Sequence, residues 1–160
     1  MTQQEIKTIA LVGGGVIGGG WATRCLANGV NVVVTDPRPE SRDYVERMID
    51  EAWPILEEAD LIAESSGQLS FVDNIEAAVA QADFVQENVP EREDLKIAIH
   101  QEISENVRAD VVIASSSSGL LPSRLQSQCK HPERLLIGHP FAPVYLLPLV
   151  EVVGSEQTSS

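Results

Sequence analysis

The chain alternates short apolar runs, rich in β-branched residues, with longer segments whose apolar positions recur every three or four residues. The first pattern is typical of buried strands and the second of amphipathic helices. Strand–helix alternation of this kind predicts an α/β fold with a doubly wound, mostly parallel sheet and helices on both faces. The predicted strands cover 6–12, 30–36, 69–72, 83–89, 110–115, 134–139 and 149–154, and the predicted helices cover 16–27, 39–58, 74–81, 90–106 and 121–128.

Residues at the ends of these segments support the assignment. Gly29 follows the first predicted helix, where a left-handed cap is expected. Asp73 or Asn74 is expected to cap the third helix, and Pro90 is expected to open the fourth. The sequence contains no internal repeat and no linker before its polar tail, so residues 1–160 are predicted to form one domain.

The turn between the first predicted strand and helix, "IALVGGGVIGGGWA", fits the pattern G-x-G-x-x-G. In that pattern the first glycine permits the tight turn, the second lets the backbone approach a pyrophosphate, and the third lets helix and strand pack closely. The free N–H groups of the helix would face the phosphates. The alternative is a glycine-rich turn without a ligand. We predict a Rossmann-type dinucleotide site whose cofactor-binding residues are Gly13, Gly14, Gly15, Val16, Ile17 and Gly18.

An acidic residue, Asp36, ends the second predicted strand, as the dinucleotide pattern requires. A carboxylate at that place can accept hydrogen bonds from both ribose hydroxyls and would repel a 2′-phosphate, so NAD is predicted rather than NADP. Arg38 lies two residues further on and would soften this preference. Asp36 as an ordinary strand-ending residue is the alternative.

Composition limits the class of protein and its partners. The 160 residues, 43% of them hydrophobic, suit one globular domain, and a net charge of -13 argues against nucleic acid or an anionic membrane as a partner. No apolar run is long enough to span a bilayer, and the first residues do not form a signal peptide. The two cysteines lie far apart without a metal-ligand pattern, so we predict a reduced, cytoplasmic protein without a metal site.

The stretch "GHPFAPVYLLPLVEVVG", residues 138–154, is almost wholly apolar but contains His139 and Glu151. Burying either group alone is unfavourable by several kcal/mol. His139 ends one predicted strand and Glu151 lies on the next, so the two are expected to meet and to form a general base with its supporting carboxylate. A buried pair with a structural role is the alternative. His100 and His131 are expected to have ordinary structural roles.

The glycine turn, "SSSSGL" and "GHPFAPVYLLPLVEVV" together resemble the NAD-binding domain of the 3-hydroxyacyl-CoA dehydrogenase family. The match covers essentially the whole chain. "QENVPEREDLK" and "HPERLLIGHP" are also similar to this family, and these motifs are longer and more specific than the glycine signature. Within the family, the motifs are most similar to the members that oxidise the 3-hydroxyl group of L-carnitine. The resemblance implies a Rossmann fold, NAD as the cofactor and the oxidation of a 3-hydroxyl group.

The resemblance also implies roles for individual residues. His139 matches the catalytic base, Glu151 its partner and Ser118 the serine that contacts the substrate, while Glu91 and Lys96 match positions near the cofactor. Other interpretations stay open for several of them. The four serines also fit a polar turn that caps the next helix, and Ser117 is a rival of Ser118. Glu91 could instead cap the following helix, and the side chain of Lys96 could instead be solvated.

Two departures from the family bear on activity. Ala142 stands where the family usually has an asparagine that helps to hold cofactor and substrate. Losing such a hydrogen bond typically removes about 0.5–1.5 kcal/mol of stabilisation. The chain also ends at Ser160, where the family's helical C-terminal domain would begin. That domain makes the family's homodimer, so we expect a truncated chain that binds NAD and needs the second domain for turnover.

The substrate expectation depends on charge. Residues 50–70 contain six acidic residues and no basic one, which disfavours the anionic coenzyme A and tolerates a cation. Carnitine carries a trimethylammonium group, which aromatic faces and carboxylates can bind. Tyr145, six residues after His139, is the favoured aromatic candidate for binding this group, and Trp53 is a second. Either side chain also fits a packing role.

Three functional hypotheses therefore remain from the sequence. The first is an NAD-dependent dehydrogenase that oxidises L-carnitine to 3-dehydrocarnitine, or acts on a similar small 3-hydroxy acid. The second is a 3-hydroxyacyl-CoA dehydrogenase. The third is an NAD-binding module without catalysis, which Ala142 would permit.

Overall fold

The computed structural model describes residues 5–159, which form one seven-stranded sheet in the order β3-β2-β1-β4-β5-β6-β7. The first six strands are parallel and β7 runs antiparallel to β6. The doubly wound α/β prediction is therefore confirmed. The strands are β1 (Thr8–Val12), β2 (Asn31–Thr35), β3 (Leu69–Phe71), β4 (Phe84–Glu87), β5 (Val112–Ser115), β6 (Leu135–Pro140) and β7 (Val150–Val153).

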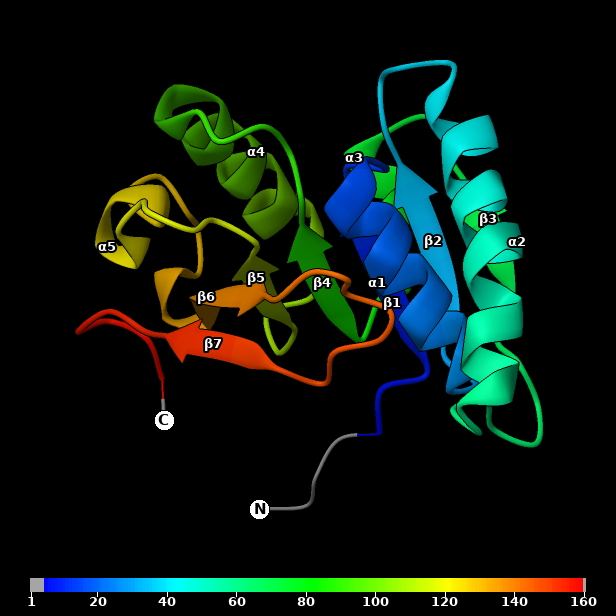
Figure 1. Ribbon diagram of the computed structural model, residues 1–160. Coiled ribbons are helices and arrows are strands. Elements are labelled where there is room, and N and C mark those ends of the chain that lie inside the picture. The colour runs from blue at the N-terminus through cyan, green and yellow to red at the C-terminus, as the bar shows by residue number, and fades with distance from the viewer. Residues whose placement is uncertain (1–4, 160) are drawn as a thin grey trace.

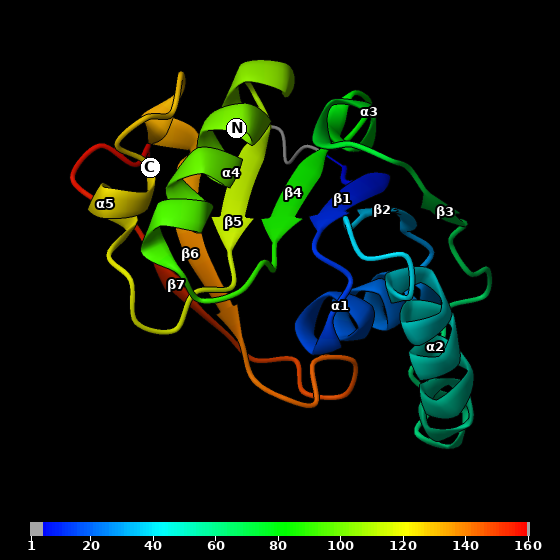
Figure 2. The same cartoon turned by 90° about the horizontal axis from the view of Figure 1, so that it is seen from above.

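Helices cover both faces of this sheet (Figure 1). Seen from above, α1 and α2 lie on one face, and α3 and α4 lie on the other (Figure 2). Contacts between α1 and α2, between α3 and α4 and between α4 and α5 agree with these two layers. The helices are α1 (Val16–Ala27), α2 (Ser41–Glu58), α3 (Ile75–Val79), α4 (Glu93–Asn106) and α5 (Pro122–Leu125), with a 3-10 turn at Pro132–Arg134.

Strand β1 divides the core into two hydrophobic clusters, as its continuous apolar sequence predicts. Successive side chains of a strand point to opposite faces. Ile9 and Leu11 pack under α1 and α2, whereas Ala10 and Val12 pack under α3 and α4. Because both faces of β1 are buried, this strand fixes the position of the glycine turn that follows it.

The strand order reverses next to β1. β2 and β3 lie on one side of it, and β4 to β7 lie on the other. Crevices at the carboxyl ends of strands on either side of such a reversal are where ligands bind in open α/β sheets. The fold therefore places the ends of β1, β2 and β4 around one candidate binding cleft.

Several predicted element ends differ from the structure. The fourth helix begins at Glu93 rather than Pro90, because Glu91 is bound to another loop and Arg92 adopts an extended conformation. The predicted caps are confirmed, since Asn74 accepts from the backbone N–H of Ala77 and Gly29 has a φ of 78°.

The apolar segment 138–154 is only partly buried, since Gly138, Pro140 and Val144 are buried but most of its later residues are exposed. All four residues of β7 are exposed, and so are Leu147 and Leu149 in the preceding loop. β7 is the last strand of the sheet, so only one neighbour covers it. The apolar composition of this segment therefore does not mark a buried strand.

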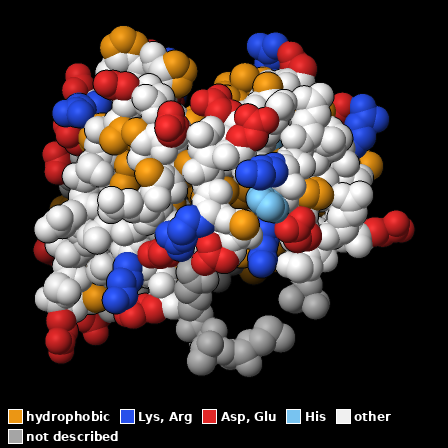
Figure 3. All heavy atoms as spheres, turned by 180° about the vertical axis from the view of Figure 1, so that it is seen from behind, with side chains coloured by type: hydrophobic (Ala, Val, Ile, Leu, Met, Phe, Trp, Pro, Cys, Tyr) orange, Lys and Arg blue, Asp and Glu red, His pale blue; other side chains and the backbone are white. Residues whose placement is uncertain are grey.

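Charged side chains are distributed over the surface. On the face shown in Figure 3, acidic side chains are spread widely, and basic ones lie among them rather than in one patch. Within residues 5–159, none of the helices has the length and apolar character needed to cross a bilayer.

Candidate active site

A cleft of about 440 Å³ opens at the reversal point of the sheet, where the dinucleotide site is predicted. Its walls come from the carboxyl ends of β1, β2 and β4 and from α3 and α4. The lining includes Val12, Gly13, Gly15, Thr35, Asp36, Pro37, Arg38, Ile75, Asn88, Val89, Pro90, Leu95 and Ile99. Two of the predicted glycines and the predicted acidic residue therefore share one apolar cleft.

The glycine turn has no room for side chains at two positions. Gly13 has a φ of 104°, and a Cβ there would lie 2.8 Å from the backbone oxygen of Asn88. A Cβ on Gly18 would lie 2.0 Å from the carbonyl oxygen of Gly13, because α1 starts directly against the turn. These positions require glycine for close backbone packing, as the pattern predicts.

The N-terminus of α1 is open to a ligand. Its N-cap, Gly15, provides no side-chain cap, and the first turn contains no acidic residue. The N–H of Gly19 donates to the carbonyl of Gly15 at 2.8 Å, so the N–H groups of Val16, Ile17 and Gly18 come before the first N–H that is bonded within the helix. Such groups bind phosphate, and the turn therefore fits the pyrophosphate of NAD.

Asp36 is held tightly at the same cleft. Its Oδ2 accepts from the N–H of Gly14 at 2.8 Å and from Nη2 of Arg38 at 2.7 Å. Its Oδ1 accepts from the N–H and Nε of Arg38 at 2.9 and 3.0 Å. Burial opposes the charge of Asp36, but the bonds from Arg38 and Gly14 outweigh it and keep the pKa of Asp36 below its ordinary value. Asp36 is therefore an ionised acceptor, covered by a guanidinium.

Arg38 is placed to influence the choice between NAD and NADP. Its side chain is 55% exposed and lines the cleft beside Asp36. Replacing Asp36 with alanine is expected to lower the affinity for NAD by about tenfold or more, because a charged hydrogen-bond acceptor is lost. The same change should raise the affinity for NADP, because Arg38 is released to bind a 2′-phosphate. Calorimetric titration with both cofactors measures the change. The double variant Asp36→Ala/Arg38→Ala should lose the gain for NADP, and unchanged affinities in Asp36→Ala would contradict the assignment.

A second cavity of about 290 Å³ adjoins the first, since Asn88 and Val89 line both. It brings together Ser118, His139, Glu91 and Lys96, which lie on three different segments of the chain. The lining is completed by Ile17, Ser116 and Pro140. Four predicted site residues therefore converge on this cavity, although only the sheet topology brings them close.

His139 and Glu151 form a cross-strand pair. They are direct partners in the antiparallel register of β6 and β7, and Nδ1 of His139 lies 3.0 Å from Oε2 of Glu151. Because Glu151 contacts Nδ1, the other ring nitrogen, Nε2, is not bonded to this carboxylate. The side chains are 27% and 61% exposed, so the pair is not buried. An exposed pair typically contributes about 0–1 kcal/mol to stability, and a purely structural role explains it poorly.

The serine turn after β5 separates its two candidate serines. The hydroxyl of Ser117 is buried, donates to Oε1 of Glu91 at 2.6 Å and accepts from the N–H of Leu120. Ser118 is exposed and lines the cavity with His139. Ser118 is therefore the serine that a ligand can reach.

The structure does not support the alternative roles of Glu91 as a helix cap and of Lys96 as a solvated side chain. Glu91 does not cap α4, because its Oε1 accepts from the N–H groups of Ser118 and Gly119 at 3.0 and 3.2 Å. Burial opposes the charge of Glu91, and these bonds with the one from Ser117 keep its pKa below the ordinary value. Lys96 is not solvated, since its side chain is 1% exposed.

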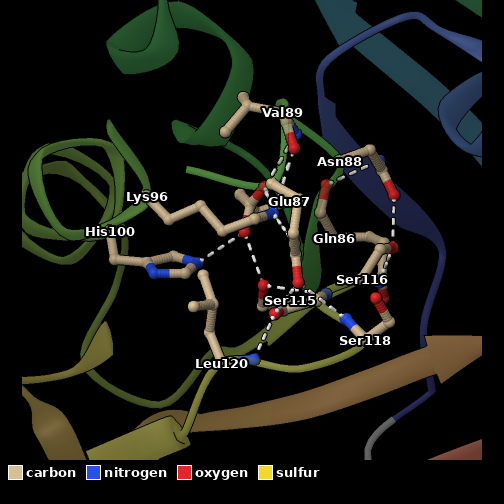
Figure 4. Close-up of polar contacts among 12 residues, drawn as sticks. Gln86, Glu87, Asn88, Val89, Lys96, His100, Ser115, Ser116, Ser118 and Leu120 are labelled. Atoms are coloured by element: carbon tan, nitrogen blue, oxygen red, sulfur yellow. Dashed lines mark hydrogen bonds and ion pairs between the residues drawn. The ribbon is translucent and has the colours of Figure 1, made fainter. Parts of the chain in front are cut away.

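Sequence reasoning missed the polar residues at the end of β4. Gln86 and Glu87 are buried, and Glu87 contacts both Lys96 and His100 (Figure 4). His100 is therefore part of a buried polar cluster with Glu87 and Lys96 beside the cavity. The available signal was three consecutive polar residues, Gln86, Glu87 and Asn88, in a predicted buried strand.

The two aromatic candidates lie apart from His139. Tyr145 and Ala142 line a separate cavity of about 300 Å³ with Val16, Gly20, Met48, Pro143 and Val144. Trp53 packs against the core under α2 and lines another cavity with Glu46 and Asp50. Neither aromatic residue lines the cavity of His139 and Ser118.

Comparison with known families identifies the chain. Residues 8–160 match the family described as the NAD-binding domain of 3-hydroxyacyl-CoA dehydrogenase. The chain belongs to the 3-hydroxyacyl-CoA dehydrogenase family. The predicted resemblance is confirmed, and the matched domain is an NAD-binding domain. Among residues 5–159, no cluster of His, Cys, Asp or Glu is arranged to hold a metal ion.

Curated relatives narrow the comparison within the family. The chain is 52% identical to an L-carnitine dehydrogenase from Pseudomonas aeruginosa over 98% of its own length and 49% of that protein. It is 48% identical to an L-carnitine dehydrogenase from Bacillus cereus over 99% of its own length and 49% of that protein. The chain therefore spans about half the length of these curated relatives.

Two solved structures have a similar fold. A 5-formyl-3-hydroxy-2-methylpyridine 4-carboxylic acid 5-dehydrogenase, described as an NAD+-dependent dismutase, has a TM-score of 0.90 at 32% identity, with 97% of this chain and 51% of that chain covered. An (S)-3-hydroxybutyryl-CoA dehydrogenase from Ralstonia eutropha has a TM-score of 0.86 at 26% identity, with 97% and 56% covered.

Proposed function

We propose that the full-length protein containing this chain oxidises the 3-hydroxyl group of L-carnitine to 3-dehydrocarnitine with NAD. The observation that carries the proposal is the cavity that His139 and Ser118 both line, which adjoins the predicted NAD cleft. The curated relatives, which are identical to this chain at about half of the aligned positions, are named L-carnitine dehydrogenases, and this supports carnitine as the substrate.

His139 is the proposed general base. With Glu151 on Nδ1, the ring has its lone pair on Nε2, which can take the proton of the substrate hydroxyl. Glu151 then stabilises the imidazolium, and Ser118 is placed to hold the reacting oxygen by a hydrogen bond. NAD, when bound, supplies the acceptor for the hydride that leaves the carbon. Glu91 and Lys96, in the same cavity and next to the NAD cleft, are proposed to position the cofactor.

The acidic segment expected to disfavour coenzyme A does not line the site. Its six acidic residues between 50 and 70 are all exposed, but the loop after α2 bonds to Leu26 and Ala27, at the end of α1 far from the NAD cleft. None of the six lines the cleft or the cavity of His139, so the preference for carnitine over an acyl-CoA rests on the curated relatives. Tyr145 remains a candidate for binding the cation of carnitine, but it lines a separate cavity and not the one that contains His139.

The assay that tests the proposal is NADH formation by the full-length protein. We expect absorbance at the NADH band to rise with L-carnitine and to stay flat with 3-hydroxybutyryl-CoA at the same concentration. Efficient oxidation of the acyl-CoA alone would overturn the proposal in favour of a 3-hydroxyacyl-CoA dehydrogenase. NAD binding by calorimetry without oxidation of either substrate would identify an NAD-binding module, in agreement with the exposed Ala142 at the place of a polar family residue.

A further inference from the structure

A buried cluster of polar side chains, drawn in Figure 4, adjoins the cavity that contains His139, because Lys96 belongs to the cluster and lines that cavity. Glu87, at the end of β4, and Lys96 and His100, on α4, have side chains that are 0%, 1% and 0% exposed. Oε1 of Glu87 lies 2.7 Å from Nζ of Lys96. Nε2 of His100 lies 3.0 Å from Oε2 of Glu87, although the two atoms are not aligned for a hydrogen bond.

The carboxylate of Glu87 is the centre of this cluster. Besides Lys96, it accepts from the N–H of Val89 at 2.6 Å and from the hydroxyl of Ser115 at 2.6 Å. Burial alone would raise the pKa of Glu87, but the contacts with His100 and Lys96 outweigh it and keep the pKa below its ordinary value. A buried, ionised carboxylate is retained only where several such partners hold it.

Each arm of the cluster ends on a wall of the cavity. Nζ of Lys96 donates to the carbonyl of Val89 at 3.0 Å and lies 3.6 Å from Oε2 of Glu91. The other oxygen of Glu91 holds the turn that contains Ser118. On the second arm, the hydroxyl of Ser115 accepts from the N–H of Ser117 at 3.3 Å. Glu87 therefore connects the loops that follow β4 and β5.

We propose that Glu87 is a positioning residue for the dehydrogenation. It holds the ammonium of Lys96 at the floor of the cavity and, through Glu91, keeps the turn with Ser118 opposite His139. This role rests on the proposed function, since it assigns a task to the same cavity. The charge is essential to it: an amide at position 87 keeps the shape but leaves the ammonium of Lys96 buried without its nearest anion.

A double-mutant cycle in the full-length enzyme tests the role. The variants are Glu87→Gln, Lys96→Met and the double variant, and the readouts are kcat, KM for carnitine and the NAD dissociation constant, at a temperature well below every melting temperature. We expect each single variant to lower kcat about 10- to 100-fold, because misplaced catalytic groups have effects of that size. The double variant should be as active as Lys96→Met, because Glu87 acts through Lys96.

Several outcomes would overturn the proposal. One is wild-type kcat and NAD affinity in Glu87→Gln with only a lower melting temperature, which marks a structural role. Another is a double variant whose rate loss is the product of the two single losses. If Glu87→Gln does not fold, the double variant, which removes both buried charges, is compared with Lys96→Met, and a further loss of kcat contradicts the role.

Two controls complete the design. Glu102→Gln removes an exposed carboxylate from the same helix and should leave all three readouts unchanged. If wild-type enzyme does not oxidise carnitine, the proposed function fails, and the same cycle is measured on NAD affinity alone. Non-additive weakening of NAD would then still support Glu87, and additive weakening would reject it.

Discussion

Replacing His139 with alanine in the full-length enzyme is expected to lower kcat by about 10²–10⁴-fold, the usual contribution of a general acid–base group. The imidazole is paired with Glu151 at 3.0 Å and lies in the cavity beside the NAD cleft rather than in it. NAD affinity should therefore stay close to that of the wild type. Steady-state kinetics with carnitine, together with NAD titration, measure the two effects separately.

Glu151→Gln is the matched variant for this prediction. It preserves the shape of the side chain and removes the charge that supports the imidazolium, so turnover should fall, but less than in His139→Ala. Because the pair is exposed, neither variant should change the melting temperature by much. Full activity of Glu151→Gln across the pH range would show that the carboxylate has no catalytic role.

Gly18→Ala is expected to have the largest effect on NAD binding among changes in the glycine turn. Replacing a glycine inside a helix with alanine ordinarily stabilises the folded protein by roughly 0.5–1 kcal/mol. At Gly18 the new Cβ would lie 2.0 Å from the carbonyl oxygen of Gly13, a backbone atom that can move only with the turn itself. We expect a loss of about 1–3 kcal/mol in the free energy of unfolding and NAD binding weakened more than tenfold.

Gly119→Ala is the control for that substitution, because a Cβ on Gly119 would meet no atom within 4 Å. Its melting temperature and NAD affinity should match those of the wild type. Thermal unfolding and NAD titration of both variants decide the matter. Wild-type NAD affinity in Gly18→Ala would mean that α1 can withdraw from the turn, and the close packing would not be a requirement for the cofactor.

Local patterns were sufficient to predict most of the fold. Each predicted strand and helix exists, because apolar periodicity distinguishes strands from helices, although in β7 the apolar residues are exposed and do not face the core. The glycine turn and Asp36 were also predictable, since their function depends on backbone conformation within one strand–turn–helix unit. The contact between His139 and Glu151 followed from neighbouring strands, although the antiparallel register that pairs them was not evident from the sequence.

Long-range contacts explain what the sequence did not predict. Lys96 is a polar residue in a helix and is therefore expected at the surface, but Glu87 on a strand end provides the partner that permits its burial. Glu91 was expected at a helix start because of its position after Pro90, whereas three donors from the serine turn bind it instead. The donors of the serine turn lie 26 to 28 residues from Glu91, beyond the range of local patterns. Glu87 is only nine residues from Lys96, but it lies on a strand, and the pattern of the helix alone does not reveal it.

The exposed strand β7 also affects how the chain behaves in concentrated solution. It forms one edge of the sheet, its outer N–H and C=O groups face no neighbouring strand, and three of its four residues are valines. An uncovered apolar edge of this kind is a template for strand pairing between molecules, which leads to aggregation. Val152, 67% exposed, is the position where a lysine would best oppose such pairing, because its charge would repel the same edge of another molecule.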